Sequence, residues 1–401
     1  MMLGFLLARS GVDVIVLEKH ADFLRDFRGD TIHPATLELM YELGLLEEFL
    51  KRPHQQVTEL GGQIGGQAVK LADFSHLPTH CKFLALMPQW DFLNFLVEQG
   101  KRYGGFHLLM QTEAVGLIEE NGRVLGVKTK TANGEMGIRA RLTIGSDGRR
   151  SILRDRGGLQ VIDLGAPMDI VWFHLSRHAT DPPQTLGYVQ SGKILVMINR
   201  DDYWQCGYVI AKGAFDEIRK KGLDQFREEL ARLAAFLSDR VDEVQDWNDV
   251  SLLTVKVDRL RQWWRSGLLC IGDAAHAMSP IGGVGINLAI QDAVAAANIL
   301  GPKLAAGKLT DHDLEAVQNR RELPTRITQR VQVLIQNNVI ERVLASGHSL
   351  SVPWPIKLLQ AWPFLRRIPA RMIGMGFRPE HVQTPENTAT LHLQESQAKT
   401  S

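Results

Sequence analysis

The sequence of 401 residues has few cysteines, little net charge and no long apolar run, and each shortage excludes a class of protein. Its three cysteines, Cys81, Cys206 and Cys270, are far apart and form no CxxC pair. This pattern excludes a disulfide framework and a cysteine-based metal site. A net charge of +1 argues against nucleic-acid binding, which needs a strong positive field. No uninterrupted apolar run reaches the roughly 18 residues of a membrane span.

The remaining composition is that of an ordinary globular protein. Hydrophobic residues make up 44% of the chain and charged residues 23%, and the length allows two or three domains. The opening MMLGFLLARS is apolar but has no basic start and no small-residue cleavage site, so it does not fit a secretory signal peptide. We expect a cytoplasmic protein with no metal, no nucleic-acid partner and no stable membrane insertion. Nothing in the sequence indicates the oligomeric state.

The first 20 residues have the pattern of the second half of a βαβ nucleotide-binding unit. Residues 1–9 are good helix formers, and Gly11 lies where such a helix ends. Residues 12–17 form a β-branched run that Glu18 closes. The first half of such a unit, a strand and a glycine-rich phosphate loop, belongs directly before Met1.

The rest of the chain alternates between helical and strand-like stretches. The pattern predicts a helix from Pro34, a β-ribbon over 57–74 and a helix over 88–103. Asn121-Gly122 and Asn133-Gly134 are hairpin signals within 107–145. Strand-like stretches from about 165 to 260 surround a polar helix, which indicates an antiparallel sheet inserted into an α/β domain. Helices are expected over 286–345, and the polar residues 379–401 are expected to be disordered.

The strongest motif is LLCIGDAAHAMSPIGGVGINLAIQDA, which begins with the strand-like run 268–271. That run ends in Gly272-Asp273, and a glycine-rich loop leads into a helix near Ile286. An Asp at a strand end can accept hydrogen bonds from sugar hydroxyls, and loop glycines let backbone N–H groups approach a ligand. The helix N-terminus adds partial positive charge for an anion. The alternative is a turn whose glycines serve packing alone.

A second motif, LTIGSDGRRSILR, follows the same strand–turn–helix pattern. A strand ends at Ile144, a tight turn contains Asp147 and Gly148, and Ser151 opens the next helix. Asp147 can either cap that helix or orient a ligand. The residues alone do not decide between these two roles.

In this order, the two motifs resemble those of the flavin-dependent aromatic hydroxylases, the single-component monooxygenases of the p-hydroxybenzoate hydroxylase type. The resemblance extends over roughly residues 1–345. It implies an α/β fold: a Rossmann-like FAD-binding domain with an inserted antiparallel β-sheet substrate domain and a helical C-terminal region. The expected parts are 1–165 for FAD binding, with 57–90 contributing to the substrate region, then 166–262 for the substrate sheet, 263–345 for the second FAD part, and 346–401 for C-terminal helices and a polar tail.

The resemblance also implies contacts to the cofactor. Asp273 would hold the ribityl chain, Glu18 the adenosine ribose, and Asp147-Gly148 would lie near the flavin and take part in nicotinamide use. The full set of expected FAD contacts is Glu18, Lys19, Arg28, Gln89, Asp147, Gly148, Gly272, Asp273, Pro280, Gly283, Gly285, Ile286 and Asn287.

The start of the family's first motif falls outside the sequence. Gly4 and Gly11 match the later positions of that motif, which places the last glycine of GxGxxG directly before Met1. We therefore expect a flavoprotein lacking its first strand and phosphate loop. Whether such a chain binds FAD at all is left open.

The implied activity is that of an FAD-dependent monooxygenase. It would hydroxylate an aromatic or polyketide-like substrate with NADH or NADPH and O₂ through a flavin C4a-hydroperoxide. Two alternatives stay open: a flavin-dependent reductase of an isoprenoid or lipid double bond on the same fold, and an inactive truncated remnant. The substrate itself and the choice of nicotinamide are not indicated.

Other residues have two interpretations each. The candidate pocket residues are Pro280, Trp172, His174, Trp204 and Cys206, but strand alternation allows either face of the inserted sheet to line the pocket. His276 is either a proton relay or a packing residue beside the flavin. The basic, apolar segment WPFLRRIPARMIGMGFR favours a cap helix on the core over contact with a membrane surface.

Overall fold

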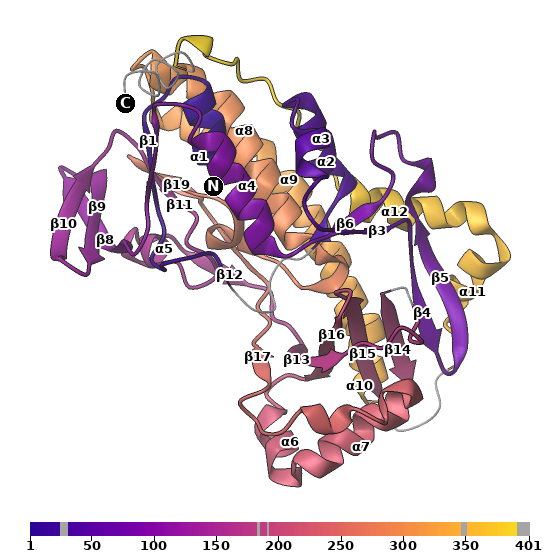
Figure 1. Cartoon of the computed structure of the whole chain (residues 1–401). Coiled ribbons are helices and arrows are strands. Elements are labelled where there is room, and N and C mark those ends of the chain that lie inside the picture. The colour runs from indigo at the N-terminus through magenta and orange to yellow at the C-terminus, as the bar shows by residue number, and fades with distance from the viewer. Residues whose placement is uncertain (25–30, 183–184, 191, 346–350, 391–401) are drawn as a thin grey trace, which may run out of the picture.

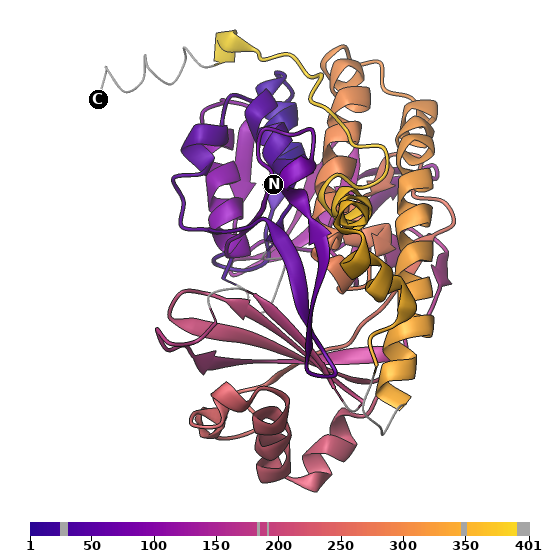
Figure 2. The same ribbon diagram turned by 90° about the vertical axis from the view of Figure 1, so that its right-hand side faces the viewer.

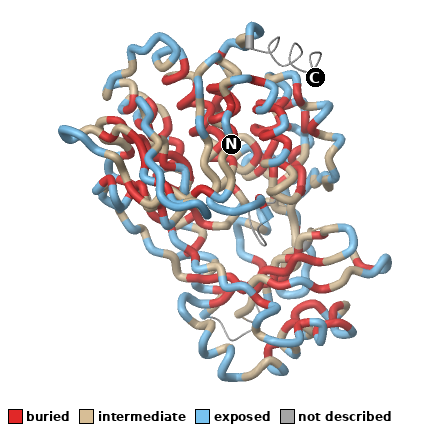
Figure 3. The backbone as a smooth tube through the Cα atoms, turned by 60° about the vertical axis from the view of Figure 1, so that its left-hand side comes forward, coloured by how far each residue is buried: buried red, intermediate tan, exposed pale blue. Residues whose placement is uncertain are grey.

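The computed structural model describes residues 1–24, 31–182, 185–190, 192–345 and 351–390. An α/β body lies above a mixed sheet, and the helices α6 and α7 cover the lower face of that sheet (Figures 1 and 2). Buried stretches run through the upper body and through the strands of the lower sheet (Figure 3). Arg28, an expected FAD contact, lies outside the described residues.

The upper body contains two separate pieces of parallel sheet. In one piece, β1 (Val14–Leu17) pairs with β7 (Phe106–Leu109). In the other, β11 (Thr143–Gly145) pairs with β20 (Leu268–Cys270), which also pairs with β19 (Trp264–Arg265). Within the described ranges no strand joins the two pieces, and Ile15 on β1 is 48% exposed. A central parallel strand is normally buried on both faces, so β1 has an open side.

Helices pack against this split sheet. α1 (Met2–Arg9) contacts α8 (Gly285–Ala305) and α4 (Gln89–Gly100), and the contact forms much of the largest apolar core. Gly4 lies directly against β1, where an added Cβ would come within 2.6 Å of Val16. The other elements of this part are α2 (Pro34–Glu42), α3 (Leu46–Phe49), α5 (Ile152–Arg156), β2 (Thr31–Ile32), β3 (Gln55–Val57), β6 (Leu84–Leu86), β12 (Val161–Asp163), β18 (Asp258–Leu260) and β21 (His276–Ala277).

The predicted hairpin at Asn121-Gly122 is confirmed. The second hairpin is also present, but its turn is Ala132-Asn133, because Gly134 already pairs with Thr131. β8 (Glu113–Glu120), β9 (Arg123–Thr131) and β10 (Gly134–Arg139) form an antiparallel meander. Asn121 and Gly122 both have positive φ, 50° and 76°, as a two-residue hairpin turn requires.

The lower sheet has seven strands in the order β17-β13-β16-β15-β14-β4-β5. All its pairings are antiparallel except one: β14 and β4 run parallel, so the expectation of a purely antiparallel sheet is wrong at that junction. The parallel pairing arises because β4 and β5, from the 57–74 ribbon, join the edge of the inserted strands. The bounds are β4 (Glu59–Ile64), β5 (Gln67–Asp73), β13 (Met168–Ser176), β14 (Leu186–Gln190), β15 (Lys193–Asn199), β16 (Tyr203–Ala211) and β17 (Ser251–Leu253).

The predicted polar helix is two helices. α6 (Phe215–Lys221) ends at Gly222, whose φ of 97° breaks the helix before α7 (Leu223–Leu233). Phe226 and Leu230 of α7 are buried against the lower face of the sheet.

The chain then forms long helices. α9 (Asp311–Ile335) continues through a π-helical turn at Gln336–Ile340 into α10 (Glu341–Ala345), and α11 (Trp354–Ala361) and α12 (Arg367–Gly374) follow. The segment Ile281–Ala305, which includes α8, is long and apolar enough to cross a membrane. It packs against α1 and α9, and its side chains are largely buried, so α8 is a core helix.

The expectation that the tail from residue 379 is disordered is wrong for its described part. The Glu380 side chain is buried, the backbone N–H of Asn387 donates to the Arg9 carbonyl at 2.8 Å, and Tyr103 donates to Glu386 at 2.6 Å. These polar residues find partners on α1, on α9 and in the turn after α4, which composition alone does not reveal.

Candidate cofactor site

The two motifs meet at one edge of the sheet. β11 and β20 are parallel neighbours, with Gly145 opposite Cys270, so Asp147 and Asp273 follow strands that end side by side. The Arg149 guanidinium Nε donates to the Asp273 carboxylate at 3.1 Å. Arg149 therefore joins the turn of one motif to the turn of the other, a contact that the sequence did not indicate.

Asp147 acts as a helix cap in this structure. Its carboxylate accepts hydrogen bonds from the Ser151 hydroxyl and from the backbone N–H of Leu153, and Ser151 in turn accepts from the Arg154 N–H at 3.0 Å. Gly148 has φ +84°, which a residue with a side chain rarely adopts. The capping role, one of the two alternatives for Asp147, is thus present.

The glycines of the stronger motif allow close approach of neighbouring backbone. Gly272 has φ +58°, and a Cβ there would lie 2.9 Å from the Ala289 Cβ on α8. Gly283 has φ +63°, and its Cβ would lie 3.3 Å from the Thr31 hydroxyl. Packing therefore explains part of the glycine pattern.

The N-terminus of α8 lacks a side-chain cap among the described residues. The first N–H groups of a helix have no partner within the helix, so those of Gly285, Ile286 and Asn287 carry partial positive charge at this edge. The Asn287 side chain is used internally, because its Oδ1 accepts from the His33 N–H at 3.2 Å and from the Thr36 hydroxyl at 2.7 Å. Only its backbone remains for a ligand.

His33, which the sequence analysis did not select, lies beside the glycine loop. Its Nδ1–H donates to the Ile373 carbonyl of α12 at 2.6 Å. Its Nε2 is buried and has no hydrogen-bond partner in the described part of the chain, and a Cβ at Gly283 would lie 3.6 Å from it. Burial lowers the pKa of His33 to about 4, against the opposing effect of the bond to Ile373, so the ring is neutral at pH 7.

A buried ionic network lies beneath Gly272-Asp273. The Asp292 carboxylate accepts from the Gly272 N–H at 3.0 Å, from His276 Nε2 at 2.6 Å and from Arg321 Nε at 2.9 Å. Arg321 also donates to Glu380 of the C-terminal tail at 3.1 Å. Burial would raise the pKa of Asp292, but His276 and Arg321 outweigh it and hold the pKa below its usual value. His276 thus stabilises the motif indirectly, through the Asp292 carboxylate that binds the Gly272 N–H.

Two glutamines hold the loop between the motif and α8. Gln332 Nε2 donates to the carbonyls of Ser279 and Ile281 at 2.9 and 3.0 Å, and its Oε1 accepts from the Ser279 N–H. Gln336, in the π-helical turn, donates to the Ser279 hydroxyl at 2.8 Å. In the sequence, Gln332 and Gln336 are marked only as polar residues on the face of a helix that becomes buried. Pro280 lies within this loop, where its carbonyl accepts from the Gly283 N–H at 3.0 Å.

The remaining expected contacts lie on other elements. Glu18 and Lys19 follow β1, and the Glu18 carboxylate accepts from the His20 N–H at 3.0 Å. Burial lowers the pKa of the Met1 amino group, and the charge of Glu18 opposes this effect. Gln89 is the first residue of α4 and is half-buried.

The structure separates the four aromatic, histidine and cysteine candidates by face. Trp204 and Cys206 are fully buried on the side that α7 covers, and Trp204 donates to Asp181 at 2.9 Å. Trp172 lies on the opposite side, in a cluster with Ile281 of the glycine loop. His174 shares that side by alternation and stacks edge-on with Tyr203 at 4.8 Å. Only Trp172 and His174 belong to the face turned toward the motif.

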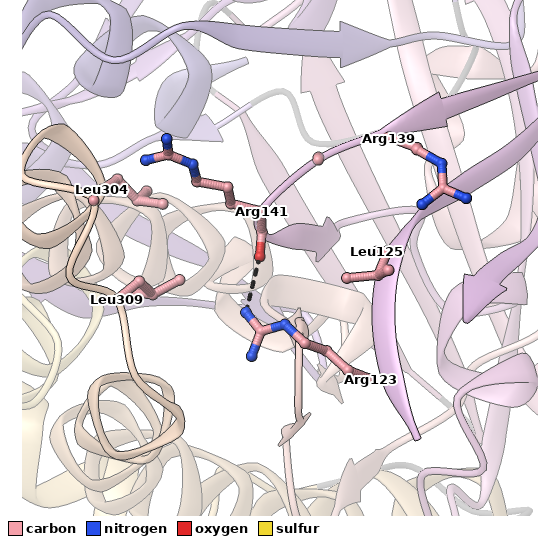
Figure 4. Close-up of a pocket in the computed structure, with 8 residues that line it drawn as sticks. Arg123, Leu125, Arg139, Arg141, Leu304 and Leu309 are labelled. Carbon is pink, nitrogen blue, oxygen red and sulfur yellow. Dashed lines mark hydrogen bonds between the residues drawn. The ribbon is translucent and has the colours of Figure 1, made fainter. Parts of the chain in front are cut away.

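A cavity in the described part of the chain lies away from the motif. It has a volume of about 470 Å³ and is formed between β9, β10 and the end of α8 (Figure 4). Its lining residues are Arg123, Leu125, Arg139, Ala140, Arg141, Leu304, Gly307 and Leu309. None of them is an expected site residue.

The residues present at the motif fit a bound FAD. Within the described ranges, Arg149 Nη1 and His33 Nε2 are both buried without a hydrogen-bond partner. Buried polar atoms normally have partners, so these two atoms fit a polar ligand. The uncapped α8 favours an anionic or electron-rich group, and Asp273, whose side chain is 33% exposed, can accept hydroxyl groups.

Comparison with known proteins supports this interpretation. A family model described as FAD binding domain matches residues 1–331. The 6-methylpretetramide 4-monooxygenase of Streptomyces rimosus is 33% identical over 337 residues, which cover 83% of this chain and 80% of that protein. A rifampicin monooxygenase of Streptomyces venezuelae is 30% identical over 311 residues, which cover 76% of this chain. The chain spans 62% of that relative's length.

A solved structure shares the fold. The crystal structure of a probable FAD-dependent monooxygenase from Pseudomonas aeruginosa superposes with a TM-score of 0.72. The match has 21% sequence identity and covers 86% of this chain and 94% of that one.

Proposed function

Because the chain belongs to the FAD-binding domain family of flavoprotein aromatic monooxygenases, we propose that it hydroxylates an aromatic or polyketide-like small molecule with FAD, NADH or NADPH, and O₂. The observation that carries this proposal is the Arg149–Asp273 contact, which brings the two motifs together beside the uncapped end of α8. We also propose a cytoplasmic location.

The chain's own residues would hold the cofactor and shape its surroundings. Asp273 would accept hydrogen bonds from the ribityl hydroxyls, and Arg149, which donates to that carboxylate, would orient it. The N–H groups of Gly285, Ile286 and Asn287 would stabilise negative charge on the ring system. Bound FAD would supply hydride acceptance and oxygen activation, chemistry that side chains lack.

The substrate would lie between the glycine loop and the upper face of the seven-stranded sheet. Trp172 clusters with Ile281 there, and Trp172 and His174 therefore form the proposed wall. This wall would exclude water from the reacting groups. The relative named for 6-methylpretetramide supports a substrate of aromatic or polyketide-like character.

Removal of the Asp273 carboxylate tests the cofactor site. Asp273→Ala is expected to weaken FAD binding at least about tenfold, or about 1.4 kcal/mol, the scale of one charge-assisted hydrogen bond. Fluorescence titration with FAD measures it, and Asp224→Ala, at an exposed carboxylate on α7, is the matched control. Unchanged FAD affinity in a folded Asp273→Ala protein would contradict the assignment.

The reaction class has its own test. NADH and NADPH oxidation is measured in the presence of O₂ with a series of phenols and polycyclic aromatics. A monooxygenase is expected to oxidise the nicotinamide faster with its aromatic substrate and to release a hydroxylated product. Reduction of an isoprenoid alkene, with no stimulation by any aromatic, would favour the reductase alternative.

A further inference from the structure

The C-terminal segment from α11 to α12 presents an apolar outer surface. Trp354, Trp362 and Phe364 are 76%, 54% and 60% exposed, and they are the exposed tryptophan and phenylalanine side chains of the described residues. Leu358 and Ile368 of the same segment are also exposed, at 37% and 58%. Exposed large apolar side chains gathered in one short segment indicate an interaction surface. We call these five side chains the aromatic patch.

The charged residues of this C-terminal segment are all basic. Residues 351–378 contain five basic residues, Lys357, Arg366, Arg367, Arg371 and Arg378, and no Asp or Glu. Lys357 and Arg371 are exposed, one adjacent in sequence to Leu358 on α11 and the other three positions after Ile368 on α12. The pKa of Asp73 on β5 is lowered, against the opposing effect of burial, chiefly by hydrogen bonds from Ser75 and more weakly by His76 and Arg367, so one of the five charges is partly balanced. The outer surface therefore combines aromatic rings with excess positive charge.

The inner side of the segment is fixed to the body of the protein. Gln360 of α11 exchanges two hydrogen bonds with the backbone of Lys70 on β5, at 3.2 and 2.7 Å. Ala370 of α12 is fully buried, and Ile373 accepts the hydrogen bond from His33. The helices cap the core on one side, as the sequence favoured, and this anchoring presents the aromatic patch outward.

We propose that the aromatic patch and its basic residues bind an anionic lipid surface. Tryptophan and phenylalanine insert at the headgroup boundary, and Lys and Arg beside them attract anionic headgroups. A second copy of the chain fits less well, because a symmetric dimer would bring the same basic patches of both copies together. The bound surface would lie next to the glycine loop, since a Cβ at Gly282 would be 3.8 Å from Ile373.

Vesicle binding by the full chain tests this proposal and needs no catalytic activity. The vesicles are phosphatidylcholine alone, or phosphatidylcholine with about one third phosphatidylglycerol. Flotation is expected to recover at least about tenfold more protein with the anionic vesicles, and added salt is expected to reduce that binding. Binding should also shift the tryptophan emission to shorter wavelength.

Two double variants separate the contributions. Trp362→Ser with Phe364→Ser, and Lys357→Gln with Arg371→Gln, are each expected to reduce binding to anionic vesicles at least about tenfold. Met136→Ser, at an exposed apolar residue of β10 on the opposite side of the molecule, is the control and should bind as the unaltered chain does (Figure 1). Circular dichroism checks that each variant is folded.

Three results would overturn the proposal. The first is absence of binding to either vesicle, and the second is equal binding to neutral and anionic vesicles. The third is a dimer, seen by light scattering, that the Trp362→Ser with Phe364→Ser variant dissociates; it would assign the patch to a second copy of the chain.

Discussion

Mild acid is expected to destabilise the fold through His33. Burial lowers the pKa of this ring to about 4 in the folded protein, whereas an unfolded chain protonates it near its ordinary value of 6.5. Between these two pH values the unfolded state binds one proton more than the folded state. The unfolding free energy therefore keeps the full contribution of neutral His33 above about pH 6.5 and loses it progressively as the pH falls toward 4. The experiment lowers the pH from 7.5 to 5.0, about two and a half units.

The size of the effect follows from the two pKa values. Single-site linkage over that shift gives a loss of about 2 kcal/mol of unfolding free energy from His33 alone. His33→Asn removes the titration but retains an N–H that can donate to the Ile373 carbonyl in place of Nδ1. The variant should therefore lose about 2 kcal/mol less than the unaltered chain on acidification.

Urea unfolding followed by tryptophan fluorescence at both pH values measures the difference. His107→Asn, at an exposed histidine on β7, is the matched control and should retain the full acid sensitivity. If all three proteins lose the same stability between the two pH values, the burial of a neutral His33 against the glycine loop is refuted.

Three further predictions concern the motif and its support. Asp292→Asn is expected to lower the unfolding free energy by about 3–5 kcal/mol, because Arg321 stays buried without its full countercharge. Thermal unfolding measures this loss, and Asp224→Asn, at an exposed carboxylate, is the control. Gly272→Ala is expected to lower soluble yield and FAD affinity together, since φ is +58° and the Ala289 Cβ is 2.9 Å away; normal FAD titration would contradict this. Adding a strand and a GxGxxG loop directly before Met1 is expected to pair with the open side of β1 and to raise bound flavin per mole of protein, measured by absorbance. Equal flavin content in both proteins would show that the open sheet edge does not limit binding.

Local signals in the sequence were enough for many elements. Asn121-Gly122 predicted a hairpin turn, and the structure has one, because few other residue pairs adopt two consecutive positive φ angles. Pro34 correctly marked the start of α2, since proline is tolerated in the first turn of a helix. The Gly272-Asp273 motif identified a strand end and the helix after it. Each of these signals depends on residues within a few positions of one another.

The tertiary structure decided how distant segments use those elements. Alternation along β13 and β16 defined two faces of the sheet but did not say which face is the core. In the folded chain α7 covers one face, which assigns Trp204 to the core, and Ile281 lies on the opposite face, which assigns Trp172 to the proposed pocket wall. Arg321 reaches Asp292 across 29 positions of sequence, and His33 reaches Ile373 across 340. The sequence by itself determined local geometry, because φ, ψ and periodicity depend on near neighbours. Burial and ion pairing depend on which remote segments pack together, and only the folded chain settles that.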